Sequence, residues 1–340
     1  MLKAEYRTRG PVPQDVIEAV PFEKPQLEEG QVLLELLAAP INPSDVLTLT
    51  GQYGMLPPLP AIGGNEGVAK VVEHGPGVEG PAIGKTVLLP IGIGSWATHM
   101  VAEAKSLVPL PDGVDPVQLS MITVNPPTAS LLLSEFVDLE EGDWVIQNAA
   151  NSGVGSYLIA LAKMRGLKTV NVVRRESLVE PLLAAGADVV LVDGVVDGKS
   201  LAERVKAATD GAAIRLGIDA VGGAATARLG EALTEGATLV NYGAMSGEPC
   251  TLAPTVIIFK DVTVRGFWLA KWFRSATPEQ QKEVFGEIIG LVASGKLSAP
   301  IHATYPVKDI KEAVAVAAGG ERNGKVIIVN DKEAGQVNKI

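Results

Sequence analysis

Cysteine is nearly absent from this chain of 340 residues, in which Cys250 is the single thiol. One thiol cannot form an intramolecular disulfide, which fits a reducing compartment. Long apolar runs are absent too: no segment reaches the about 20 residues that span a bilayer, and residues 1–10 lack the apolar core of a signal peptide. The sequence therefore predicts a soluble, cytoplasmic protein without membrane insertion.

Positive charge and aromatic residues are also scarce. The formal net charge is −10, which argues against nucleic acid or an anionic membrane as the main partner. Aromatic residues make up only 4% of the chain, so aliphatic side chains must fill the interior, and the hydrophobic fraction of 47% is ample for two cores. We therefore expect two domains and a small-molecule partner.

The two halves of the chain differ in composition and in expected secondary structure. Prolines and glycines crowd residues 40–94, and short β-rich segments at 32–36 and 67–72 lie between turns, which is typical of a compact, irregular β domain. From residue 124 onward, strands alternate with helices, and strands are expected at residues 188–192, 216–221, 238–242 and 262–267. This alternation predicts an α/β fold with a doubly wound parallel sheet.

The C-terminal part follows a different pattern. Thr277 and Gln280 form a capping-box-like start for a helix over residues 278–293, and residues 325–329 read as a strand. Neither belongs naturally to the parallel sheet, so we assign the tail to the first domain. The predicted arrangement is a discontinuous β-rich domain of residues 1–123 and 270–340 and a Rossmann domain of residues 124–269.

Residues 144–175 outline a dinucleotide site, with a strand at 144–149, a small-residue turn at 151–155, a second strand at 169–173 and two arginines at its end. The helix between them is expected to bury Tyr157, Leu158, Ala160, Leu161 and Met164. Glycines in such a turn let the backbone approach a pyrophosphate, whose charge the helix N-terminus favours. Ala150 and Ser152 occupy the first two fingerprint positions and only Gly155 keeps the third, so the turn alone is a weak signal.

Arg174 and Arg175 follow the second strand, where NAD-specific sites usually carry an acidic residue for the ribose hydroxyls. Two arginines suit the 2′-phosphate of NADPH. The same two arginines could equally lie in solvent at the end of the strand and bind no ligand. Together with the turn, they favour NADPH as the cofactor.

Five segments carry a family resemblance that extends over essentially the whole chain: residues 41–45, 51–54, 63–69, 147–155 and 259–269. In these segments the chain resembles the zinc-independent members of the medium-chain dehydrogenase/reductase superfamily. It is most similar to the mitochondrial-type trans-2-enoyl thioester reductases, which are related to quinone oxidoreductases. The resemblance implies a GroES-like, β-rich catalytic domain beside the Rossmann domain.

Zinc-dependent members of that superfamily bind the metal with cysteine and histidine. Their Gly-His-Glu motif appears here as Gly64-Asn65-Glu66, in which asparagine replaces the histidine. The three histidines, His74, His99 and His302, are scattered along the chain. We therefore expect no metal.

Tyr53 is the candidate catalytic residue. Reduction of an activated double bond places hydride on the β carbon, and a hydroxyl donor can stabilise the charge that builds on the carbonyl oxygen. Tyr53 lies in the loop from Gly51 to Gly54, where its phenol could project into a cleft or pack on the prolines at 57, 58 and 60. The resemblance favours catalysis, because the reductases carry their catalytic tyrosine in this loop.

The resemblance also implies a set of cofactor contacts, with Asn125 near the nicotinamide and residues 151–154 at the pyrophosphate. The side chains of Phe267 and Trp268 could equally belong to the core. Glu176 departs from the Arg-Asp-Arg-type triplet of the family and could weaken the second anion contact. The full predicted set is Asn125, Asn151, Ser152, Gly153, Val154, Gly155, Arg174, Arg175, Tyr242, Gly243, Ala244, Met245, Phe267, Trp268, Leu269 and Lys325.

The leading hypothesis is an NADPH-dependent reductase of trans-2-enoyl thioesters, carried by coenzyme A or acyl carrier protein, or of related enones. Tyr53 would be its oxyanion or proton donor. The alternative enzyme is a zinc-free NADPH:quinone oxidoreductase, and a minor alternative is a non-catalytic NADPH-binding partner protein. A homodimer is expected through the apolar edge strand at residues 262–267.

Overall fold

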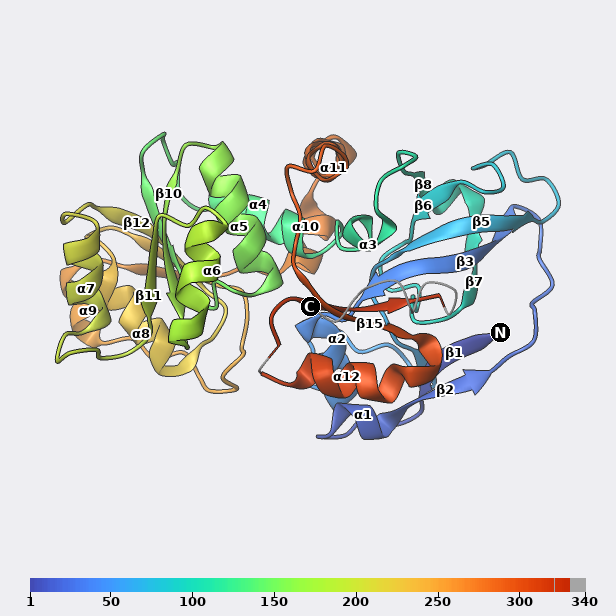
Figure 1. Ribbon diagram of the computed structural model, residues 1–340, viewed down its shortest axis with the longest axis horizontal. Coiled ribbons are helices and arrows are strands. Elements are labelled where there is room, and N and C mark those ends of the chain that lie inside the picture. The colour runs from blue at the N-terminus through green and yellow to red at the C-terminus, as the bar shows by residue number, and fades with distance from the viewer. Residues whose placement is uncertain (321, 331–340) are drawn as a thin grey trace. The chain divides into compact units, whose positions relative to one another are not determined.

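The computed structural model describes residues 1–320 and 322–330. Two compact units are present, one of residues 1–124 and 285–340 and one of residues 125–284. We call the first the β-rich unit and the second the parallel-sheet unit (Figure 1).

The larger sheet of the β-rich unit has seven strands in the order β15-β16-β3-β5-β6-β8, and β7 also pairs with β3. Strand β3 is central, and its Val32, Leu34 and Leu36 are fully buried in the main core. The strands are β3 (Gln31–Pro40), β5 (Val68–His74), β6 (Thr86–Leu88), β7 (His99–Glu103), β8 (Val108–Pro109), β15 (Ile301–Pro306) and β16 (Lys325–Val329).

A second, three-stranded sheet in the order β2-β1-β4 completes the β structure of this unit. Its strands are β1 (Leu2–Tyr6), β2 (Ile17–Pro21) and β4 (Ala61–Ile62). The accompanying helices are α1 (Pro13–Val16), α2 (Pro43–Thr50), α3 (Pro116–Leu119) and α12 (Ile310–Ala318), with the 3-10 turns η1 (Ala104–Ser106) and η3 (Val307–Asp309). Helices α1 and α12 pack against each other, as Figure 1 shows.

The C-terminal strand β16 pairs antiparallel with β3, so that Ile327 lies opposite Pro40 and Val329 opposite Ala38. Strand β15 then adds in parallel to β16. Residues 325–329 are therefore part of the sheet of the first unit, as the sequence predicts.

The parallel-sheet unit contains six strands in the order β11-β10-β9-β12-β13-β14, and every pair is parallel. Its strands are β9 (Trp144–Gln147), β10 (Lys168–Val173), β11 (Val189–Val192), β12 (Ile214–Asp219), β13 (Thr238–Asn241) and β14 (Thr263–Gly266). The strand order reverses at β9, which is where ligands bind in open sheets of this type. The predicted fold class, a β-rich unit plus a unit with a doubly wound parallel sheet, is confirmed.

Helices cover both faces of this sheet. One face packs on side chains of α5 and α6, such as Ile159 and Leu182, and the other packs on α7, α8 and α9, through Val205, Leu229 and Val256 (Figure 1). The helices are α4 (Asn125–Ser134), α5 (Gly153–Met164), α6 (Val179–Ala184), α7 (Leu201–Ala208), α8 (Gly223–Ala232), α9 (Pro254–Phe259), α10 (Leu269–Ser275) and α11 (Pro278–Ala293), with the 3-10 turn η2 (Glu176–Leu178).

Two local predictions need correction. Met164 is 45% exposed and Ala160 only half-buried, whereas Ile159 and Ala162 are buried, because α5 packs against α4 as well as the sheet. The strand expected through Val221 ends instead at Asp219, whose carboxylate accepts the backbone N–H of Val221 and starts a turn.

The second boundary between the units also differs from the predicted one. It falls between residues 284 and 285 rather than between 269 and 270. The side-chain amide of Gln281 donates to the carbonyls of Phe273 and Ala276, so the start of α11 is hydrogen-bonded to the end of α10. The first boundary, between 124 and 125, lies one residue from the predicted position.

Within the described ranges, no helix is both long enough and apolar enough to cross a membrane. The cytoplasmic location stays a prediction.

Candidate active site

The turn after β9 brings the start of α5 close to the end of the strand. Ser152 caps α5, and its Oγ accepts the backbone N–H of Gly155 at 3.1 Å. A Cβ on Gly155 would lie 2.4 Å from the carbonyl oxygen of Ala150, so only glycine lets the helix approach the strand this closely. Ala149 has a φ of 47°, a conformation that a non-glycine residue adopts at a local cost. Gly155 therefore allows the close packing that the third fingerprint glycine allows, although Ala150 and Ser152 replace the first two glycines.

Five of the predicted cofactor-binding residues lie in this turn and at the start of α5, and we call this segment, residues 151–155, the phosphate turn after its predicted ligand. Gly153 is the first residue of α5, where the free N–H groups of a twelve-residue helix lie. Backbone N–H groups and the helix dipole at such a position favour an anion. The set is Asn151, Ser152, Gly153, Val154 and Gly155.

Arg174 and Arg175 follow β10, the strand beside β9, at the same carboxyl edge of the sheet. Arg174 is exposed and Arg175 is half-buried. The structure thus brings the two arginines to the edge at which the phosphate turn begins.

On the other side of β9, residues 242–245 follow β13. A Cβ on Gly243 would lie 2.6 Å from the carbonyl oxygen of Ala220, so glycine is required here. Burial raises the pKa of Tyr242, whose hydroxyl has a hydrogen bond with Ser152 of the phosphate turn. Met245 is exposed. The segment from Tyr242 through Ala244 is therefore held beside the phosphate turn.

Phe267, Trp268 and Leu269 follow β14 and are half-buried. The ring of Phe267 meets Phe136 edge-on at 5.9 Å between centroids, and the guanidinium of Arg274 lies 5.1 Å from the Trp268 ring. Both aromatic side chains therefore have partners within the parallel-sheet unit, and their contact with a cofactor stays a prediction. Asn125 is buried at the start of α4 in the same unit.

Sequence reasoning missed a buried carboxylate at this edge, Asp219 at the end of β12. Burial opposes its ionisation, but hydrogen bonds lower its pKa below the ordinary value. A signal was available, since Asn148, Asp219 and Asn241 are all polar residues at the ends of strands. Five groups donate to the carboxylate: Asn148 Nδ2 at 2.6 Å, the N–H of Val221 at 2.9 Å, the N–H of Gly222 at 3.0 Å, Thr226 Oγ1 at 2.6 Å and Asn241 Nδ2 at 3.0 Å.

In the β-rich unit, Tyr53 follows α2. Gly51 ends the helix with a φ of 79°, which favours glycine, and the backbone N–H of Tyr53 donates to Leu47 at 3.2 Å. The tyrosine is half-buried, in a loop whose following residues 54–60 are exposed. The loop thus holds the phenol at the surface of the β-rich unit.

The opposite end of α2 begins in a buried charged cluster, which sequence reasoning also missed. Asn42 caps the helix: its backbone N–H donates to Asp45 Oδ2 at 2.7 Å and its side-chain amide donates to Glu66 Oε1 at 2.7 Å. The Lys325 ammonium donates to Asn42 Oδ1. Asn65 donates to Asp45 Oδ1 at 2.7 Å.

Glu66 is the centre of this cluster. Its Oε2 accepts the backbone N–H groups of Thr123 at 3.1 Å and Val124 at 3.0 Å. Burial raises the pKa of Glu66 to about 7 and that of Asp45 to about 6, although Lys325 lowers both, and burial lowers the pKa of Lys325 to about 8. Lys325, predicted to contact the cofactor, is only 4% exposed in this cluster.

The residues at the Gly-Asn-Glu position do not fit a zinc ion. The cluster offers two carboxylates, two carboxamides and an ammonium, without the thiolates or imidazoles that zinc prefers. Among residues 1–320 and 322–330, no group of three or more His, Cys, Asp and Glu side chains could hold a metal ion.

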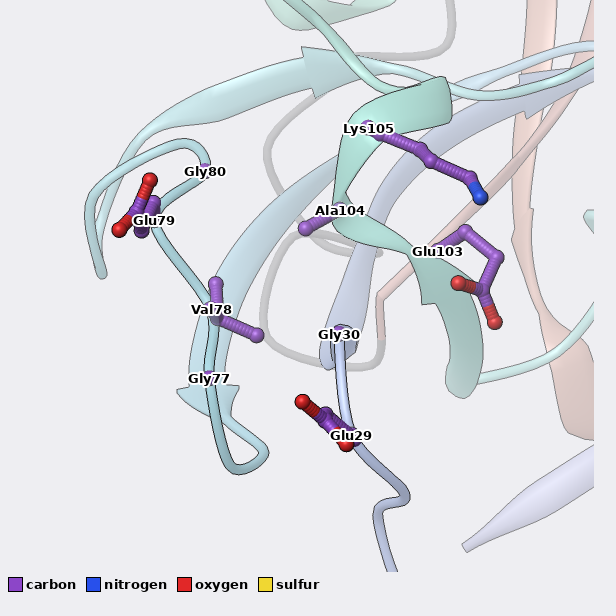
Figure 2. Close-up of a pocket in the computed structure, with 9 residues that line it drawn as sticks. All are labelled: Glu29, Gly30, Gly77, Val78, Glu79, Gly80, Glu103, Ala104 and Lys105. Carbon is purple, nitrogen blue, oxygen red and sulfur yellow. The ribbon is translucent and has the colours of Figure 1, made fainter.

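A hollow of about 420 Å³ in the β-rich unit is lined by none of the predicted site residues (Figure 2). Its lining carries three glutamates, Glu29, Glu79 and Glu103, and one lysine, Lys105. None of the predicted catalytic or cofactor residues lines it, so it is not the predicted site.

Comparisons with known proteins agree with this architecture. Residues 28–112 match the family of alcohol dehydrogenase GroES-like domains, and residues 153–285 match the family described as zinc-binding dehydrogenase. The chain is 38% identical over 307 residues to the mitochondrial enoyl-[acyl-carrier-protein] reductase of Rattus norvegicus, covering 89% of this chain and 82% of that protein.

Two solved structures are also similar. One is a "putative NADPH:quinone reductase" from Bacillus thuringiensis, with a TM-score of 0.86 and 30% identity over 97% of this chain and 98% of that one. The other is a complex of Etr1p with NADP and crotonyl-CoA, with a TM-score of 0.86 and 25% identity over 96% and 99%. The chain therefore belongs to the medium-chain dehydrogenase/reductase superfamily, in the family of the mitochondrial enoyl-[acyl-carrier-protein] reductases, and is an oxidoreductase.

Proposed function

We propose that this protein reduces the α,β double bond of a trans-2-enoyl thioester with NADPH. One edge of the parallel sheet is the main support for the proposed cofactor. The phosphate turn, Gly243 and the two arginines after β10 all lie at this edge. The rat relative is named for enoyl reduction, and the Etr1p structure contains NADP and crotonyl-CoA, which supports the substrate class.

When bound, NADPH would supply the hydride that the β carbon of the substrate takes up. The electron pair of the double bond moves onto the α carbon and the carbonyl oxygen. The α carbon takes up a proton either from the Tyr53 phenol, which water then reprotonates, or from water while the phenol donates a hydrogen bond to the carbonyl oxygen. The products are NADP⁺ and the saturated thioester, so atoms and electrons balance.

The test of Tyr53 is nicotinamide absorbance with short and long trans-2-enoyl-CoA substrates. We expect Tyr53→Phe to lower kcat by about 100-fold or more, the usual cost of losing one oxyanion donor. Tyr305→Phe is the matched control, since it makes the same change in β15 of the same unit and should leave kcat unchanged. Equal rates for wild type and Tyr53→Phe would exclude the tyrosine from the reaction.

The choice of NADPH is tested at Arg174 and Arg175. Replacing both by alanine should raise KM for NADPH at least tenfold and leave KM for NADH unchanged, because only NADPH carries the 2′-phosphate. If KM rose equally for NADPH and NADH, the arginines would not recognise the 2′-phosphate.

Quinone reduction is the second candidate, favoured by the similarity to the Bacillus thuringiensis structure. A panel of quinones and enoyl-CoA substrates separates the two enzymes. Turnover with quinones alone, indifferent to Tyr53→Phe, would assign the protein to the quinone reductases. NADPH binding without turnover of any acceptor would leave a non-catalytic binding protein.

We also propose a homodimer through β14. All four residues of this edge strand are exposed, and α9, which precedes it, exposes Ile258 and Phe259. An exposed strand edge can pair with its copy in a second subunit. Val264→Lys should then give a monomer by light scattering, whereas Ile83→Lys, at an exposed apolar site of the β-rich unit, should remain a dimer. A monomeric wild type would refute this proposal.

A further inference from the structure

Three polar side chains connect neighbouring strands at the carboxyl edge of the parallel sheet. Asn148 directly follows β9, Asp219 ends β12 and Asn241 ends β13. Asp219 accepts from Asn148 through Oδ1 at 2.6 Å and from Asn241 through Oδ2 at 3.0 Å. One buried carboxylate thus joins the ends of three strands.

The same three residues also hold the backbone on both sides of β12. The side-chain oxygen of Asn148 accepts the N–H of Ala220 at 2.8 Å, and Asn241 Nδ2 donates to the carbonyl of Gly243 at 2.9 Å. The N–H of Tyr242 donates to the carbonyl of Asp219 at 3.0 Å. The network therefore sets where the phosphate turn begins and where the segment at 242–245 leaves the sheet.

The centre of the network is the charged carboxylate of Asp219, which hydrogen bonds hold in a fixed position. The donors to Asp219 are amides and one hydroxyl, and two of them are backbone N–H groups immediately before α8. Burial works against the charge, yet these bonds lower the pKa of Asp219, so the carboxylate stays ionised at neutral pH. Hydrogen bonds to a charged acceptor are stronger than neutral ones and fix geometry more tightly.

The order of the strands indicates which half of a bound dinucleotide would lie on the same side of β9 as Asp219. The arginines lie after β10, on one side of β9, whereas Asp219 and residues 242–245 lie after β12 and β13, on the other side. A dinucleotide that binds across the switch point places its adenosine half on the first side and its nicotinamide half on the second.

We propose that Asp219 is a positioning residue for the nicotinamide half of the cofactor. It acts through Asn148 and Asn241 on the two backbone segments that border that half. This inference rests on the proposed NADPH function. It adds that binding of the whole cofactor depends on Asp219, while binding of the adenosine 2′-phosphate half does not.

The experiment measures dissociation constants of the full-length protein for NADPH and for 2′,5′-ADP, which lacks the nicotinamide half. In Asp219→Asn the new amide group must face a donor, since both carboxylate oxygens accept hydrogen bonds. We expect Kd for NADPH to rise about tenfold, the equivalent of one charge-assisted hydrogen bond. Kd for 2′,5′-ADP should stay within about twofold.

Asp143→Asn is the matched control. Asp143 pairs with Arg215, so it also connects β9 with β12, but at the opposite edge of the sheet. It should change neither constant. Thr226→Val removes one donor to Asp219 and should weaken NADPH binding in the same direction, which keeps the test available if Asp219→Asn does not fold.

Each outcome decides one point. An unchanged Kd for NADPH in Asp219→Asn and Thr226→Val, or an equal loss for both ligands, would overturn the positioning role. If the wild type binds neither ligand, the proposed cofactor itself is wrong. If 2′,5′-ADP binds normally and only NADPH is weakened in both variants, the inference holds.

Discussion

Replacing Lys325 by methionine tests the electrostatics of the buried cluster in the β-rich unit. Methionine keeps most of the length of the side chain and removes its charge. In the wild type, burial raises the pKa of Glu66 to about 7 and of Asp45 to about 6, and the Lys325 ammonium counteracts both increases. Without the ammonium, each carboxylate would lose its nearby positive charge.

The pH dependence follows from the direction of these pKa shifts. Both folded values lie above the ordinary values of 4.5 and 3.8, so the native protein binds more protons than the unfolded chain. These two groups therefore lower stability as pH rises from about 4 to about 7. Lys325 offsets that loss only where the carboxylates are ionised, and its own pKa of about 8 keeps it mostly charged at pH 7.5.

We expect Lys325→Met to lower the free energy of unfolding by about 3–5 kcal/mol at pH 7.5, the usual cost of breaking a buried ion pair. At pH 5 both carboxyls are largely protonated, and the cost falls to about 1 kcal/mol, near that of the lost hydrogen bond to Asn42. Urea unfolding followed by circular dichroism at the two pH values measures the difference.

Lys85→Met is the control for this experiment. Lys85 pairs with Asp112 at 2.9 Å on the surface of the same unit, where the Asp112 side chain is 83% exposed. Its loss should cost less than about 1 kcal/mol at either pH. Equal destabilisation by Lys325→Met at pH 5 and pH 7.5 would refute the electrostatic account of the cluster.

Three further predictions concern backbone positions and caps. Gly155→Ala should abolish measurable NADPH binding, because the new Cβ meets Ala150 at 2.4 Å; normal titration of the variant would contradict the close approach. Gly51→Ala should cost about 1–2 kcal/mol, since its φ is 79°, and should lower kcat by displacing Tyr53; a wild-type kcat would show that the loop tolerates the strain. Thr277→Ala removes the cap of α11 and should cost about 1 kcal/mol in urea titrations at unchanged kcat, whereas any loss of activity would contradict a purely structural cap.

Local patterns in the sequence were sufficient for much of this architecture. The βαβ unit around the phosphate turn, the edge strand at 262–267 and the helix over residues 278–293 are all formed, and the predicted capping pair at the start of that helix is present. These features depend on residues close together in the chain. Apolar periodicity, turn residues and caps act over a few residues, so they can be read without knowing the fold.

The sequence also limits the possible orders of the parallel strands, because alternating strands and helices are compatible with few sheet orders. From that order the sequence alone places Arg174 and Arg175 beside the phosphate turn. It does not show that a Cβ on Gly155 or on Gly243 would lie 2.4 Å or 2.6 Å from a carbonyl oxygen, since both close approaches arise only when the backbone is folded.

The buried polar groups come together only in the folded chain. Lys325 and Asn42 are separated by 283 positions in the chain, and Asn148 and Asp219 by 71, yet each pair is joined by a hydrogen bond. No periodicity marks such residues, because a buried charge is stable only where partners from distant segments satisfy it. Short-range patterns therefore define the elements and the phosphate turn, whereas the folded sheets select which polar side chains meet, because those meetings depend on strand pairing rather than on neighbours in the chain.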